Sequence, residues 1–134
     1  METYPKIIIL DDDLFFGNLL KNFLSNQGYK FIELFQDEFK CIESIKQGLT
    51  IVILDHHLEK STGFEVMKKI QQKNSKVIII YLSGQEYMHI AIKAIRLGAI
   101  DYIEKNSNYF FQLKVIIDKI IADLKKTLQW NYMP

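Results

Sequence analysis

Five short apolar runs alternate with segments whose apolar residues recur at helical spacing, and this alternation constrains the fold more than any other feature. The runs cover residues 7–10, 30–35, 51–54, 77–82 and 102–103. The first, third and fourth are almost continuous in isoleucine, valine and leucine, which is typical of parallel strands covered on both faces. The second run alternates more and the fifth is short, so both suit positions near a sheet edge.

Each following segment carries an apolar stripe with a helical period. The stripes begin at Phe16, Phe39, Phe64, Ala91 and Leu113. A glycine follows the first, second and fourth stripes, and we expect these glycines to cap the carboxyl ends of the helices: Gly28, Gly48 and Gly98.

Repeated strand–helix alternation predicts an α/β protein with helices on both faces of one parallel sheet, in three layers. Because crossovers between parallel strands are right-handed, few topologies remain. The commonest at this size is a doubly wound, flavodoxin-like sheet of five strands in the order 2-1-3-4-5 with five helices. The length of 134 residues suits one such domain.

Composition excludes several classes of function. The 17 lysine and arginine residues are balanced by 16 aspartate and glutamate residues, so we expect no direct binding of nucleic acid through bulk charge. The single cysteine, Cys41, allows no intrachain disulfide and no cysteine-based zinc site. The polar start lacks the pattern of a secretion signal, and no apolar run approaches the ~18 residues of a membrane span. We therefore expect a soluble cytoplasmic protein without a membrane partner.

Acidic residues follow two predicted strands that should be neighbours. Asp11, Asp12 and Asp13 follow the first strand, and Asp55 follows the third. Ligands of open parallel sheets bind beyond the carboxyl ends of the strands, so we expect Asp11, Asp12 and Asp55 to converge. Close carboxylates repel one another by a few kcal/mol per pair, and they require a proton or a bound cation. An all-oxygen site suits Mg²⁺, while Asp13 is better placed to cap the first helix.

The ends of the other strands add a cation and a hydroxyl group. By the same rule, Ser83 and Lys105 lie opposite the carboxylates. A divalent ion and a lysine together can neutralise the oxygens of a transferred phosphoryl group. One aspartate is then the nucleophile that forms an aspartyl phosphate. Asp55 stands alone at its strand end, so we assign this role to Asp55 and the metal to Asp11 and Asp12.

The chain resembles the response-regulator receiver domain of two-component signalling in four motifs. They are IIILDDD (7–13), ILD (53–55) with Gly63 eight residues after the aspartate, IYLSG (80–84) and GAIDYIEK (98–105). All four occur in order with the family's spacing, and the likeness spans about residues 6–126. We therefore expect a receiver domain over residues 1–126 and a tail, or the start of a linker, over residues 127–134.

The resemblance implies roles for the residues at the acidic end of the sheet. Asp55 would accept a phosphoryl group from the phosphohistidine of a sensor histidine kinase or a phosphotransfer protein. Asp12 would bind Mg²⁺ directly, Asp11 would help through water, and the backbone carbonyl of His57 would be a further ligand. The chain would act as a signalling module and not as a metabolic enzyme.

The resemblance also implies a switch. Ser83 and Lys105 would contact the phosphoryl oxygens, and Tyr102 would be the aromatic residue that turns inward as Ser83 moves. The change would reach a surface on the fourth helix, fifth strand and fifth helix, which includes Ala91, Ile95 and Tyr102. A second copy of the chain or an output partner would bind there.

Two positions depart from the family pattern. Receivers usually carry proline directly after the lysine, commonly with a cis peptide bond, but this chain has Asn106. A cis bond before a non-proline residue costs ~2.5–4 kcal/mol, which favours a trans bond and a different loop, but the sequence alone leaves the isomer open. Glu59 replaces a proline that often lies four residues after the acceptor, so we expect the stretch 59–62 to be more mobile. Glu86 flanks the site, and we expect its replacement to change the rate of autodephosphorylation.

The sequence alone leaves other functions open. A degenerate receiver would keep the fold and bind partners without phosphate. A phosphohydrolase of the haloacid-dehalogenase type would need an aspartate where this chain has His57, and a flavin-binding electron carrier would need a glycine-rich loop where residues 11–13 are acidic. His56 and His57 could form a transition-metal site or a phosphohistidine relay, but adjacent residues leaving a strand point in opposite directions.

Overall fold

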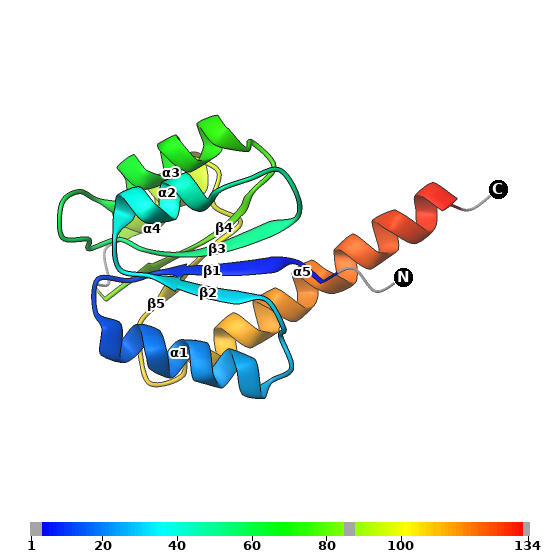
Figure 1. Ribbon diagram of the computed structural model, residues 1–134, viewed down its shortest axis with the longest axis horizontal. Coiled ribbons are helices and arrows are strands. Elements are labelled where there is room, and N and C mark those ends of the chain that lie inside the picture. Colours follow the sequence, from blue (N-terminus) through cyan, green and yellow to red (C-terminus); the bar gives the residue numbers. More distant parts are fainter. Residues whose placement is uncertain (1–3, 85–87, 133–134) are drawn as a thin grey trace.

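The structure is a computed structural model that describes residues 4–84 and 88–132, with side chains described to residue 127. Strands and helices alternate along the chain as the sequence predicts (Figure 1). The strands are β1 Lys6–Leu10, β2 Ile32–Phe35, β3 Thr50–Asp55, β4 Ile78–Ser83 and β5 Asp101–Glu104. The helices are α1 Leu14–Asn26, α2 Glu38–Ser44, α3 Gly63–Lys73, α4 Met88–Arg96 and α5 Tyr109–Tyr132.

The five strands form one parallel sheet in the order β2-β1-β3-β4-β5. The predicted fold class, strand order and edge positions of β2 and β5 are therefore confirmed. Helices α1 and α5 cover one face of the sheet, and α2, α3 and α4 cover the other (Figure 1). The result is the expected three-layer, flavodoxin-like arrangement.

The two faces of the sheet belong to two separate hydrophobic clusters. Along β3, Val52 and Leu54 pack under α2, α3 and α4, whereas Ile51 and Ile53 pack under α1 and α5. All four side chains are fully buried because successive residues of a strand point to opposite faces and both faces are covered. The continuous apolar runs in the sequence arise from this double burial.

Two of the three glycines expected to follow helices do so with a positive φ. Gly28 follows α1 with φ of 98°, and Gly98 follows α4 with φ of 112°. Both adopt the left-handed conformation that glycine tolerates best. The expectation for Gly48 is wrong, because α2 ends at Ser44 with Ile45 as its cap and Gly48 lies in the loop to β3. The apolar stripe of α2 is too short to extend the helix to the glycine.

Helix α5 continues as one helix to Tyr132, so it passes residue 126, where we expected the receiver domain to end. Figure 1 shows its last turns projecting beyond the sheet. Within the described ranges, no helix combines the length and the apolar character needed to cross a bilayer.

Candidate functional site

Three carboxylates meet at the carboxyl end of the sheet. Asp11 follows β1, Asp12 begins the loop to α1, and Asp55 is the last residue of β3. Each offers one oxygen, and these oxygens lie within 4.8 Å of one another. Asp11 and Asp55 are buried, and Asp12 is half-buried. Asp13 has the separate role we expected, because its carboxylate accepts hydrogen bonds from the backbone N–H groups of the first turn of α1.

Lys105 holds two of these carboxylates together. It follows β5, and its Nζ lies 3.0 Å from Asp11 Oδ2 and 3.2 Å from Asp55 Oδ2. Burial lowers the pKa of Lys105, but the two facing carboxylates outweigh this effect and raise it overall. The lysine is therefore charged at neutral pH, and it bridges residues that lie 94 and 50 positions away in the chain.

Burial dominates the electrostatics of Asp55. It raises the pKa of Asp55 to about 6, with a further increase from Asp11, while Lys105 acts in the opposite direction. Burial and the charge of Asp11 also raise the pKa of Asp12. Among the described residues, the three carboxylates pair with one ammonium group, that of Lys105, and a small divalent cation would offset the remaining negative charge.

The carboxylates line an open cavity of about 460 Å³. Its other walls come from α1, the β3–α3 loop, the end of β4 and the start of α5, and they include Phe16, His57, Gly84, Asn106 and Tyr109. Ser83 is fully buried at the end of β4, and its carbonyl accepts a hydrogen bond from the backbone N–H of Lys105 at 2.9 Å. The strand ends on which the sequence placed Asp55, Ser83 and Lys105 thus lie beside one another. Glu86 lies outside the described residues.

The two adjacent histidines lie against each other. Their ring centroids are 5.0 Å apart with the planes at 71°, so they do not point to opposite sides as we expected. His56 is buried and its Nδ1 is hydrogen-bonded to the Tyr81 hydroxyl, while the His57 side chain is exposed at the cavity. Burial, together with nearby cationic groups, lowers the pKa of His56, so its ring is neutral at pH 7.

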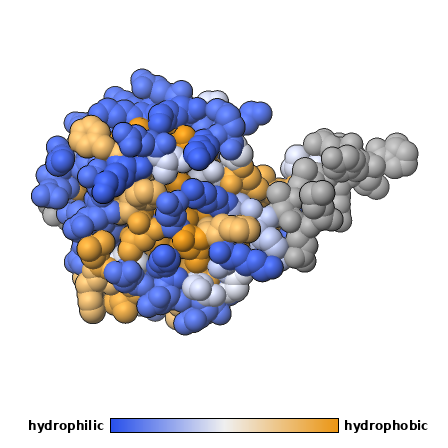
Figure 2. Space-filling view, viewed as in Figure 1, coloured by the Kyte–Doolittle hydropathy of each residue, from blue (hydrophilic) through white to orange (hydrophobic). Residues whose placement is uncertain are grey.

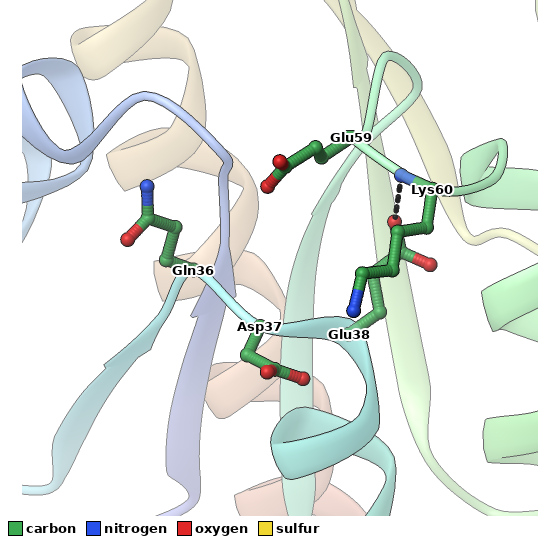
Figure 3. A pocket seen from close by; sticks show the side chains of 5 residues that line it. All are labelled: Gln36, Asp37, Glu38, Glu59 and Lys60. Carbon is green, nitrogen blue, oxygen red and sulfur yellow. Dashed lines mark hydrogen bonds between the residues drawn. The ribbon is translucent and has the colours of Figure 1, made fainter.

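Glu38, the first residue of α2, ties the β3–α3 loop to that helix. Its Oε1 accepts hydrogen bonds from the backbone N–H groups of Lys60 at 3.0 Å and Ser61 at 3.2 Å, and its Oε2 accepts one from the Ser61 hydroxyl. Figure 3 shows the bond to Lys60 and the Glu59 side chain turned away from Glu38. The loop we expected to be mobile is anchored by a residue that sequence reasoning missed. The sequence gives no signal for this contact, because acidic residues are common in the first turn of a helix, where the helix dipole favours them.

The loop from β5 to α5 is organised by the residue that replaces the usual proline. The peptide bond between Lys105 and Asn106 is trans. The Asn106 side-chain oxygen accepts a hydrogen bond from the backbone N–H of Asn108 at 3.0 Å, and the Asn106 carbonyl accepts one from Tyr109 at 3.3 Å. Asn106 therefore acts as a turn residue at the start of α5.

The predicted switch surface lies on α4, β5 and α5. Tyr102 and Ala91 are half-buried, and Ile95 is 47% exposed. Apolar side chains of α5 lie beside β5, where Phe111 and Val115 are exposed and line a groove with Tyr102. A second apolar surface marks the start of α1 (Figure 2), with the exposed residues Leu14, Phe15, Phe16 and Leu19.

The chain matches one protein family over most of its length. The family described as "Response regulator receiver domain" matches residues 7–117. Among curated proteins, the chain is 29% identical to the chemotaxis protein CheY of Treponema pallidum, over 90% of this chain and 83% of that protein. It is 28% identical to the transcriptional regulatory protein RprY of Bacteroides fragilis, over 94% of this chain and 52% of that protein. The chain thus spans about half the length of that regulator.

Solved structures show the same fold. A CheY-like receiver domain protein from Methanospirillum hungatei has a TM-score of 0.82 at 21% identity, and the match covers 93% of this chain and 99% of that one. The response regulator TrrA of Thermotoga maritima is 28% identical, with a TM-score of 0.73 and coverage of 86% and 97%. The TrrA structure is of a complex with Mg²⁺–BeF.

Proposed function

Because this chain belongs to the response regulator receiver domain family, we propose that Asp55 accepts a phosphoryl group from the phosphohistidine of a sensor histidine kinase or a phosphotransfer protein. The observation that carries the proposal is the arrangement of Asp11, Asp12 and Asp55 within 4.8 Å of one another. Lys105 lies against two of these three carboxylates. This is the charge pattern that stabilises a transferred phosphoryl group.

The same carboxylates would hold Mg²⁺. Asp12 and Asp55 would bind the ion directly, Asp11 would bind through water, and the backbone carbonyl of His57 would be a further ligand. The donors fit this hard cation because they are all oxygen atoms at an open edge where water can complete the coordination. The TrrA complex with Mg²⁺–BeF supports this choice of ion. When bound, Mg²⁺ would offset the negative charge on the transferred group.

Asp55 would be the nucleophile. An oxygen of its carboxylate forms a bond to phosphorus as the bond between phosphorus and the donor imidazole breaks, and the imidazole nitrogen keeps the electron pair. Lys105 would contact a phosphoryl oxygen and would keep the two carboxylates from repelling the incoming group. With a pKa of about 6, Asp55 is mostly ionised at neutral pH and ready to react.

Phosphorylation would change the surface formed by α4, β5 and α5, where a partner would bind. Ser83 would contact the phosphoryl oxygens, and Tyr102 would turn inward as Ser83 moves. The partner would bind beside Ala91, Ile95 and Tyr102, where exposed apolar side chains offer a contact surface. The partner is an output protein, an output domain or a second copy of the chain.

The test is labelling with acetyl phosphate or binding of beryllofluoride, each with and without Mg²⁺. Wild-type protein should gain one phosphoryl group by mass spectrometry, only when Mg²⁺ is present, and Asp55→Asn should gain none. Asp13→Asn is the matched control, because this exposed residue caps α1 and should leave labelling intact. Wild-type protein that stays unmodified at saturating donor would refute the proposal. Partner binding that persists in such a protein would instead favour a phosphate-independent receiver.

A further inference from the structure

A buried polar pair lies directly behind the acceptor aspartate and has no part in the proposed phosphoryl transfer. His56 follows Asp55 on the opposite face of the sheet, and its Nδ1 is hydrogen-bonded to the hydroxyl of Tyr81. Tyr81 is fully buried in the cluster under α2, α3 and α4. A buried phenol and a buried imidazole satisfy each other, so neither group is free to turn without losing a partner.

Tyr81 lies on β4, between β3, which ends with the acceptor Asp55, and β5, which carries Tyr102. In the sheet register, Tyr81 of β4 is directly opposite Leu54 of β3 on one side and Tyr102 of β5 on the other. Its ring stacks on that of Tyr102, with centroids 6.5 Å apart and planes at 22°. Tyr81 and Ser83 lie two residues apart on β4, so their side chains face the same side of the sheet.

The position of the Tyr81 hydroxyl is set tightly by its surroundings. The hydroxyl oxygen is hydrogen-bonded to His56 Nδ1. The Phe64 ring also stacks on that of Tyr81, with centroids 5.0 Å apart and planes at 11°. A β-carbon on Gly63 would lie 2.6 Å from the hydroxyl oxygen and 2.6 Å from the carbonyl oxygen of Asp55. Gly63 is thus packed closely against both the phenol and the backbone of the acceptor residue.

We propose that Tyr81 is a positioning residue that couples the backbone around Asp55 to the ring of Tyr102 through its hydrogen bond to His56. The inference rests on the proposed function, because it assumes that modification of Asp55 moves Tyr102. With the hydroxyl tethered, a displacement of His56 turns the Tyr81 ring, and Tyr102 must follow the face on which it stacks. Without the tether, the Tyr81 ring keeps its volume and its stacking but no longer follows the acceptor.

The test uses Tyr81→Phe, which removes only the hydroxyl group. Protein labelled with 3-fluorotyrosine is titrated with Mg²⁺ and beryllofluoride, and the Tyr102 fluorine resonance is assigned by its loss in Tyr102→Phe. In wild-type protein the resonance should move on titration, and in Tyr81→Phe the movement should fall to less than half. The affinity for beryllofluoride should change by less than about fivefold, the low end of usual coupling factors. Tyr29→Phe, which loses a hydroxyl bonded to Asp118, should keep the full movement.

A pair of His56 variants provides a second measurement that does not depend on Tyr81→Phe folding. His56→Leu removes the acceptor and should reduce the Tyr102 movement, whereas His56→Asn offers an amide oxygen in place of Nδ1 and should retain it. Full Tyr102 movement in both Tyr81→Phe and His56→Leu, with beryllofluoride still bound, overturns the coupling alone. Failure of wild-type protein to bind beryllofluoride overturns the proposed function and the coupling together.

Discussion

Lys105 Nζ lies 3.2 Å from Asp55 Oδ2, although the two residues are 50 positions apart in the sequence. The contact joins the ends of β3 and β5, which are separated in the sheet by β4. The lysine side chain is 19% exposed and the aspartate side chain 7%, so the pair is largely shielded from water. Through this ion pair and its contact with Asp11, Lys105 links the end of β5 to the ends of β1 and β3.

Replacing Lys105 by methionine should destabilise the protein at neutral pH. Breaking a buried ion pair costs roughly 3–5 kcal/mol, but a proton or a cation can replace this ammonium group, so we expect a loss of about 2 kcal/mol. The loss should shrink below pH 6, where the carboxylates of the variant take up protons. Urea unfolding at several pH values measures it. Lys114→Met, which removes the more exposed pair with Asp118, should cost less than about 1 kcal/mol.

Asp55→Asn should make the protein more stable at neutral pH although it removes the acceptor. The folded pKa of about 6 lies above the ordinary aspartate pKa of 3.8, so the native state binds the proton more tightly than the unfolded state does. The ionised carboxyl therefore costs stability above pH 6, and the cost disappears as pH falls below about 4. We expect a gain of about 1–3 kcal/mol at pH 7.5 and none at pH 4. An equal gain at both pH values would contradict this assignment of the pKa.

Mg²⁺ should stabilise the wild-type protein by binding only the folded state. At ten times its dissociation constant, a ligand of this kind adds about 1.4 kcal/mol to the free energy of unfolding. Asp12→Asn should lose most of this increment, because it removes one of the three clustered carboxylates. Thermal melts with and without MgCl₂ measure the effect, and Asp13→Asn is the control. A melting temperature that does not respond to Mg²⁺ in wild-type protein would argue against a metal site here.

The topology and the meeting of the charged residues follow from local sequence patterns. The apolar runs have the length of strands, and the rule for parallel crossovers leaves few strand orders, so the sequence alone places the carboxyl ends of β1, β3 and β5 at the same edge of one sheet. Asp11, Asp55 and Lys105 each directly follow or end a strand, and their approach depends only on that order. Backbone topology alone is enough for this part of the site.

The contacts that depend on side-chain direction could not be predicted in this way. Glu38 reaches Ser61 across 23 residues, and Tyr81 reaches His56 across 25. Both interactions require a particular rotamer and a loop path that no periodic pattern encodes. The prediction that Gly48 caps α2 was also wrong, because the short apolar stripe of α2 is too weak to locate the end of the helix.

Replacing Glu38 by glutamine should loosen the β3–α3 loop and weaken the metal site. The buried carboxylate accepts three hydrogen bonds from Lys60 and Ser61, and an amide group offers only one acceptor oxygen in place of two. We expect a loss of about 1–2 kcal/mol of stability, faster amide exchange at both loop residues, and weaker Mg²⁺ binding because the loop carries the His57 carbonyl. Glu59→Gln removes the same charge from the exposed neighbour and should change none of these quantities appreciably. Equal exchange rates in the two variants would show that Glu38 does not hold the loop.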